Sequence, residues 1–170
     1  GNALISGHQV TGDTEGQSPC VFCVAGVLHM KRGVKVNCTI NNRPFFSSWS
    51  GGKDSCLAFY HAVQAGGKPR YLFTMLSEEG ERSRSHALPL RILRQQAASL
   101  GVVLITGAAT WDSYEKVFID QLRKFKIEGI QFGVFGDIDL EEHRKWQENA
   151  CGAAEMKAYL PLWGRPRREI

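Results

Sequence analysis

A glycine turn between a short apolar strand and an apolar helix is the feature that most limits the fold of this chain. The turn is the hexapeptide Ser50–Ser55, which follows the strand-like run Phe45–Trp49 and opens a helix-like run over 54–65. A helix that begins directly after a strand points its unpaired first-turn N–H groups and the positive end of its dipole into the turn. This geometry is typical of an anion site within an α/β fold.

The side chains of the turn suit a phosphate group. Gly51 and Gly52 let the backbone approach an anion without a Cβ in the way. Ser50 and Ser55 add hydroxyl donors, and Lys53 adds a mobile positive charge. We therefore interpret the turn as a phosphate-binding loop, against the alternative that it merely joins a strand to a helix.

The pattern of the turn separates it from a Walker A loop. Ser47 stands where that motif has its first glycine, and Asp54 stands where it has a hydroxyl residue. The string instead resembles the Ser-Gly-Gly-x-Asp-Ser signature of the PP-loop ATP pyrophosphatases. That resemblance implies that residues 50–55, Asp54 included, bind the pyrophosphate part of ATP while a substrate oxygen is adenylylated.

Strand-like and helix-like runs alternate from residue 43 onward, which predicts βαβ units and a parallel sheet. We expect a Rossmann-like fold of the HUP type, with about five strands and helices on both faces. The strands are predicted over 45–49, 70–76, 102–106, 129–135 and 157–160, and the helices over 54–65, 89–100, 111–126 and 140–151. The first helix is apolar nearly all round and is expected to be buried. The β-branched strand over 102–106 is also expected to be buried.

Two further polar segments follow predicted strands and should share the carboxyl edge of the sheet with the phosphate loop. In the first, His86 could bond a phosphate or a substrate carboxyl, or lie exposed in its loop. In the second, Asp137 could hold Mg²⁺ together with phosphates, or orient a water or amine. We assign Asp139 to capping of the following helix.

Composition indicates one ordinary globular domain. The chain has 170 residues, a formal charge of +4 and 43% hydrophobic residues. No block of basic residues indicates a nucleic-acid partner, and no apolar run approaches the roughly 20 residues that a membrane helix needs. Residues 1–34 lack a sustained period and are expected to be a poorly ordered or non-native extension, which leaves 35–170 as the ATP-binding domain.

Five scattered cysteines favour a reducing cytoplasm over a disulfide framework. Cys20 and Cys23 have the spacing of half a zinc site, but no second pair lies near them, so we predict no metal ligands there. Cys56 and Cys151 fall in helical segments and are expected to be buried as small apolar side chains.

Four motifs taken together narrow the resemblance. They extend from about Arg43 to Arg165 and occur in the order Ser48–Ser55, Glu79–His86, Phe135–Arg144 and Leu160–Gly164. In this order they resemble the diphthine–ammonia ligase family of PP-loop ATPases. The family extends well beyond the Pro-Leu-Trp motif into a C-terminal part, which is absent from this chain, so we expect the ATP half without the acceptor half.

The resemblance implies ATP-dependent amidation. A carboxylate is adenylylated, pyrophosphate leaves, and ammonia displaces AMP, with ATP and Mg²⁺ as cofactors. The implied acceptor is diphthine on elongation factor 2 or an unknown substitute. In that reaction Gly136 would border the ATP site, and Asp137 and His86 would be the catalytic candidates. Two alternatives stay open at this point: a PP-loop enzyme that modifies tRNA, and an ATP-binding module without catalysis.

Overall fold

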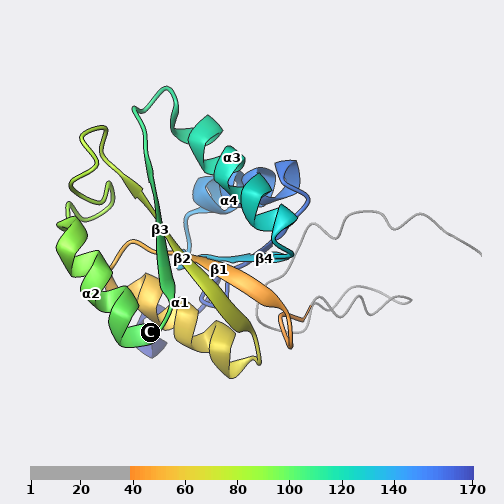
Figure 1. Cartoon of the computed structure of the whole chain (residues 1–170). Coiled ribbons are helices and arrows are strands. Elements are labelled where there is room, and N and C mark those ends of the chain that lie inside the picture. The colour runs from red at the N-terminus through yellow and green to blue at the C-terminus, as the bar shows by residue number, and fades with distance from the viewer. Residues whose placement is uncertain (1–38) are drawn as a thin grey trace, which may run out of the picture.

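Within residues 39–170, which this computed structural model describes, five parallel strands form one sheet with two α-helices on each face (Figure 1). The strand order is β3-β2-β1-β4-β5. The elements are β1 Pro44–Ser48, α1 Lys53–Gln64, β2 Lys68–Leu76, α2 Leu90–Leu100, β3 Val103–Ala108, α3 Tyr114–Ile127, β4 Phe132–Val134, α4 Glu141–Ala153, β5 Lys157–Tyr159 and a final 3-10 turn, Arg167–Glu169. The predicted α/β fold of the HUP type is therefore confirmed.

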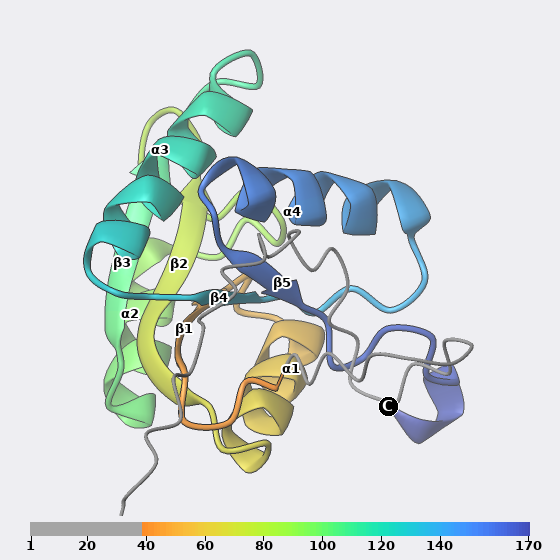
Figure 2. The ribbon, with the colours of Figure 1, turned by 90° about the vertical axis from the view of Figure 1, so that its right-hand side faces the viewer.

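The path of the chain is doubly wound. From β1 it moves outward through α1, β2 and α2 to β3, then crosses back through α3 to β4 and continues through α4 to β5. Helices α1 and α2 cover one face of the sheet, and α3 and α4 cover the other (Figure 2). The strand order thus reverses between β1 and β4, and a sheet of this kind binds ligands at such a point.

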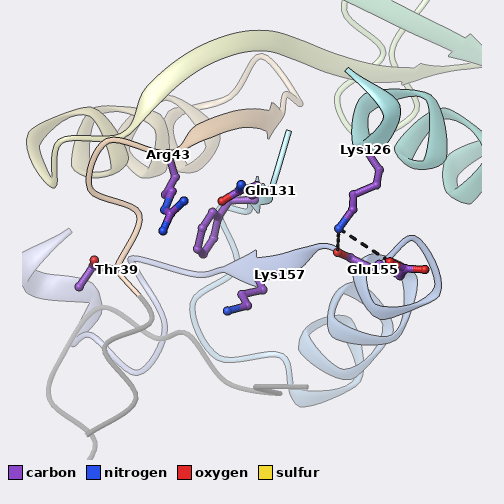
Figure 3. A pocket seen from close by; sticks show the side chains of 7 residues that line it. Thr39, Arg43, Lys126, Gln131, Glu155 and Lys157 are labelled. Atoms are coloured by element: carbon purple, nitrogen blue, oxygen red, sulfur yellow. Dashed lines mark hydrogen bonds and ion pairs between the residues drawn. The ribbon is translucent and has the colours of Figure 1, made fainter. Parts of the chain in front are cut away.

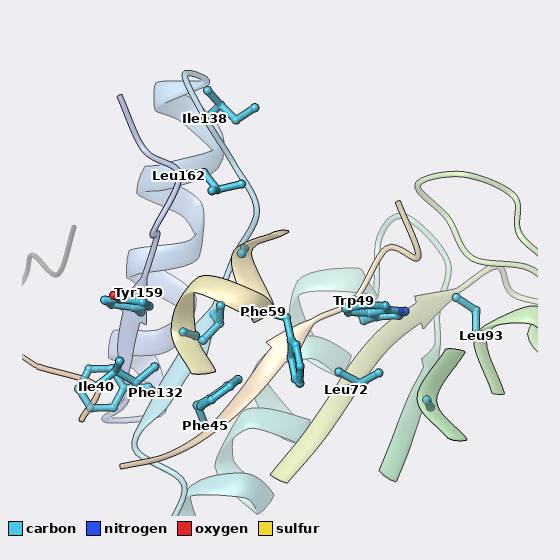
Figure 4. Packing of buried hydrophobic residues seen from close by; sticks show 14 of the residues in the cluster. Ile40, Phe45, Trp49, Phe59, Leu72, Leu93, Phe132, Ile138, Tyr159 and Leu162 are labelled. Carbon is cyan, nitrogen blue, oxygen red and sulfur yellow. The ribbon is translucent and has the colours of Figure 1, made fainter. Parts of the chain in front are cut away.

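Each face of the sheet has its own apolar core. On the face of α1 and α2, Trp49 and Phe59 pack edge to face with ring centroids 6.1 Å apart, above Phe45 and Leu72 (Figure 4). On the other face, the fully buried ring of Phe46 contacts four further phenylalanine rings, with centroids 5.2–6.4 Å away. Residues 45 and 46 alternate between the two cores, as a buried central strand requires.

Two burial predictions are wrong. Helix α1 buries one stripe, which includes Ala58, Phe59 and Ala62, but leaves Tyr60 54% exposed. Strand β3 is an edge strand, and Val103 on it is 58% exposed. The β-branched residues of β3 do fit a strand, but β-branching does not tell whether a strand has a neighbour on both sides.

The predicted leader, residues 1–34, and the pair Cys20 and Cys23 lie outside the described residues. Among the helices of residues 39–170, none combines the length and the apolar character needed to span a bilayer.

Candidate functional site

The predicted phosphate loop lies at the carboxyl end of the central strand β1. Gly51 has a φ of +81°, a left-handed conformation that favours glycine. The hydroxyl of Ser50 donates to that of Ser55 over 3.1 Å, and the hydroxyl of Ser55 donates to the carbonyl of Gly52 over 2.9 Å. No side chain caps α1 at Gly52. Its first-turn N–H groups therefore point into the loop and are available for an anion.

Strand β2 fixes the residue at which the loop starts. The N–H of Trp49 donates to the carbonyl of Phe73 over 2.8 Å, and the hydroxyl of Thr74 donates to the carbonyl of Trp49 over 2.6 Å. Both Trp49 and Thr74 are buried. The loop thus leaves the sheet from a fixed point.

His86 lies directly on the loop. A Cβ added to Gly52 would be 2.6 Å from Nε2 of His86, so the imidazole occupies the space that a side chain at position 52 would take. His86 is nevertheless an exposed residue. The structure therefore brings His86 to the phosphate loop, in agreement with the sequence-based expectation that the two segments share one edge.

Gly136, which follows β4, packs against the same loop from the side opposite the segment after β2. A Cβ at this position would lie 2.8 Å from the carbonyl carbon of Asp54 and 2.9 Å from the backbone nitrogen of Ser55. Glycine is therefore needed for the segment after β4 to reach the first turn of α1. Through Gly136, the neighbouring Asp137 is held beside the loop.

The positive charge at the loop, that of Lys53, is exposed. Nζ of Lys53 lies 2.5 Å from Oδ1 of Asp54, and the two side chains are 79% and 41% exposed. An ion pair this exposed contributes little to stability. Lys53 can therefore leave Asp54 for a phosphate at small cost.

Gln96 on α2 is a loop contact that sequence reasoning missed. Its Oε1 accepts a hydrogen bond from the indole nitrogen of Trp49 over 2.9 Å, and its Nε2 donates to the carbonyl of Gly51 over 3.1 Å. One side chain thus ties the start of the turn to a helix 45 residues away along the chain. The available signal was a polar residue three positions after Leu93, on the buried stripe of a predicted helix.

Asp137 is held by two side chains of α4. Its Oδ1 lies 2.9 Å from Nδ1 of His143, and its Oδ2 accepts a hydrogen bond from Nε2 of Gln147. His143 and Gln147 are four residues apart and so lie on the same side of the helix. Both carboxylate oxygens are therefore held by side chains of α4.

The capping role predicted for Asp139 is wrong. Leu140 is the N-cap residue of α4, and no side chain caps that helix. Asp139 instead forms a bidentate pair with Arg167, with contacts of 3.0–3.1 Å. The carboxylate faces the C-terminal 3-10 turn, a partner 28 residues away that the local pattern does not indicate.

The burial predicted for Cys56 is also wrong, whereas Cys151 is buried as expected. Cys56 lies at the exposed start of α1 and lines a mainly apolar hollow of about 360 Å³ between α1 and α2. Trp49, Gly51 and Gln96 line the same hollow, which therefore lies directly behind the phosphate loop.

A second hollow, of about 210 Å³, opens at the amino-terminal edge of the sheet (Figure 3). Arg43 and Lys157 line it, and Lys126 donates to the backbone carbonyl of Glu155 there over 2.6 Å. This hollow is at the opposite end of the strands from residues 50–55, so it takes no part in the phosphate site.

The part of the chain that the structure describes contains no group of three or more His, Cys, Asp or Glu side chains able to hold a metal ion. Magnesium bound with a nucleotide typically needs only one or two carboxylates, since phosphates and water supply its other ligands. Asp54, partly exposed at the loop, fits that limited requirement.

The parallel sheet, its strand order and the glycine loop at its carboxyl edge place the chain among Rossmann-like α/β domains of the HUP type. Residues 46–158 match the family model of the diphthamide synthase N-terminal domain. This match covers more than half of the chain, and the chain belongs to that family. The family is one of ATP-dependent ligases, which implies use of ATP. A comparison with curated proteins finds none that matches.

Proposed function

We propose that this domain binds ATP and adenylylates a carboxylate, releasing pyrophosphate, after which ammonia displaces AMP to form an amide. The observation that carries the proposal is the loop Ser50–Ser55, which His86 and Gly136 contact from two sides at the reversal of the strand order. Family membership supports ATP as the ligand. Diphthine on elongation factor 2 is the acceptor that we propose on the same basis, and the cytoplasm is the proposed compartment.

Each part of the loop has a role in this reaction. The first-turn N–H groups, the two serine hydroxyls and Lys53 hold the phosphates. Asp54 would be the protein ligand of a Mg²⁺ ion that neutralises phosphate charge. His86, on Gly52, would bond a phosphate oxygen or the acceptor carboxyl. Gly136 allows close packing, and Asp137 acts through its partners on α4. Positioning and electrostatic stabilisation of the leaving pyrophosphate would account for most of the catalysis.

ATP titration tests the binding half of the proposal. Removal of the Lys53 ammonium in Lys53→Ala eliminates a charge-assisted bond of about 1.5–3 kcal/mol, equivalent to a roughly 10- to 150-fold weaker Kd. Gly52→Val would place a side chain where the His86 ring lies and should weaken binding further. Lys124→Ala, at an exposed position near the end of α3, is the matched control. Unchanged affinity in both loop variants would refute the assignment.

Pyrophosphate release tests the catalytic half. Release that depends on a diphthine-bearing elongation factor 2 and is accompanied by AMP supports the ligase. Release with tRNA instead would indicate a tRNA-modifying enzyme. Such an enzyme would want a catalytic cysteine near the loop, and Cys56 is exposed there. ATP binding without release with either substrate would indicate a binding module.

A further inference from the structure

The contact between Asp137 and His143 determines the protonation pattern of an imidazole. A carboxylate only accepts hydrogen bonds, so in the neutral ring Nδ1 carries the proton and donates it to Oδ1 of Asp137 over 2.9 Å. The other ring nitrogen, Nε2, then has a free lone pair. The His143 side chain is 60% exposed, and no contact of its Nε2 is found among residues 39–170. A neutral imidazole held in this way is able to take up a proton.

The carboxylate that orients the ring is itself fixed. The Asp137 side chain is 23% exposed, and Gln147, which is buried, donates to its second oxygen. Oε1 of Gln147 is buried and has no hydrogen-bond partner among the described residues. The one side-chain hydrogen bond observed for Gln147 is therefore the bond to Asp137. Asp137 is thus held by a buried hydrogen-bond donor as well as by His143, which distinguishes it from an ordinary surface ion pair.

The pair adjoins the phosphate loop. Asp137 is bonded covalently to Gly136, and Gly136 packs against the backbone of Asp54 and Ser55 so closely that a Cβ would lie under 3.0 Å from both. Helix α4 begins only a few residues later, at Glu141, and carries His143 in its first turn. His143 thus lies at the same edge of the sheet as the predicted ATP site.

We propose that His143 is the general base that takes a proton from the nitrogen nucleophile, and that Asp137 and Gln147 are positioning residues that hold its tautomer. This inference rests on the proposed amidation. It adds a proton acceptor, which that reaction needs, because ammonia at neutral pH is almost entirely ammonium and has no lone pair for attack. General-base catalysis of this kind typically contributes about 10²- to 10⁴-fold.

Nε2 of His143 takes one proton from ammonium, and the nitrogen keeps the electron pair. That pair attacks the carbonyl carbon of the acyl adenylate and forms the C–N bond. The C–O bond to AMP then breaks, and its electron pair leaves on the AMP phosphate. The second proton that nitrogen sheds as the amide forms passes to solvent.

Hydroxylamine separates this role from a structural one, because it is largely uncharged at neutral pH and attacks without prior deprotonation. The assay uses the whole chain with ATP and diphthine-bearing elongation factor 2, and compares AMP formation with ammonium against hydroxamate formation with hydroxylamine. The variants are His143→Gln, which removes the base, and Asp137→Asn, whose amide would donate to Nδ1 and so favour the wrong tautomer. His61→Gln, in the last turn of α1, is the control.

We expect both variants to lose about 10²- to 10⁴-fold in rate with ammonium and to stay within about threefold of wild type with hydroxylamine. ATP affinity should not change. If wild type forms hydroxamate but His143→Gln and wild type have equal rates with ammonium, the role of His143 as general base is overturned and the proposed amidation is not. Equal losses with both nucleophiles would also overturn that role. If wild type forms no ATP-dependent hydroxamate, the proposed amidation fails, and the general base fails with it.

Discussion

Replacement of Gln96 by alanine is the sharpest test of how this fold builds its phosphate loop. The wild-type side chain joins the indole N–H of Trp49 to the carbonyl of Gly51 through bonds of 2.9 and 3.1 Å. Alanine removes both bonds and leaves the backbone of α2 unchanged, since alanine is the best helix former. The loop would then still be fixed to β2 at Trp49 but would lose both of these hydrogen bonds to α2.

The magnitude follows from burial. Trp49 is 3% exposed, so its N–H would lose its partner largely out of water, at a cost of about 1–3 kcal/mol. Gly51 is only half-buried, so water can replace Gln96 at its carbonyl. We therefore expect Gln96→Ala to lower the free energy of unfolding by about 1–3 kcal/mol.

Gln96→Glu separates stability from ligand binding. A glutamate keeps an acceptor for the indole but loses the donor to Gly51 and places a negative charge beside the phosphates. It should unfold within about 1 kcal/mol of wild type and yet bind ATP at least about tenfold more weakly. Urea unfolding and calorimetric ATP titration measure the two effects, with the exposed neighbour Gln95→Ala as control. Equal stability of Gln96→Ala and Gln95→Ala would refute the reasoning.

Three further results are expected. Gly136→Ala should lower both Tm and ATP affinity, because its Cβ would lie 2.8 Å from the backbone of Asp54. Gly152→Ala in α4, where a Cβ would have nothing within 4 Å, should raise the free energy of unfolding by up to about 1 kcal/mol. Equal effects of the two changes on Tm would contradict this. Mass spectrometry after alkylation at mildly alkaline pH should find Cys56 labelled and Cys151 protected until unfolding, because burial raises the pKa of the Cys151 thiol. Asp139→Asn should cost less than about 1 kcal/mol in urea unfolding, because its pair with Arg167 is exposed, and a larger loss would point to another role.

The sequence predicted those features that depend on neighbouring residues. The glycine turn, the helix after it and the alternation of strands with helices all follow from local pattern, and the structure has them. Features that depend on strand order could not be predicted from the sequence. The exposure of β3 follows from its place at the edge of the sheet, which no property of residues 103–108 reveals.

Side-chain contacts between residues far apart in the sequence likewise limited how much of the site could be predicted. The bond of Gln96 to Trp49 spans 47 residues, and the pair of Asp139 with Arg167 spans 28. The partners of Asp137 are only 6 and 10 residues away, and they share one side of a predicted helix. That contact was within reach of sequence reasoning, which considered Asp137 as a magnesium ligand or as a residue that orients a water or amine and did not consider its partners on α4.

The position of the loop in the sheet accounts for how tightly it is surrounded. Because β1 is the central strand, its carboxyl end has β2 on one side and β4 on the other, so the segments after both strands can reach the turn. The segment after β2 places His86 on Gly52, and the segment after β4 places Gly136 on the start of α1. An edge strand would offer one such neighbour. A turn that must present backbone N–H groups to an anion at fixed distances is better held from two sides, since little reorganisation is then left for the reaction itself.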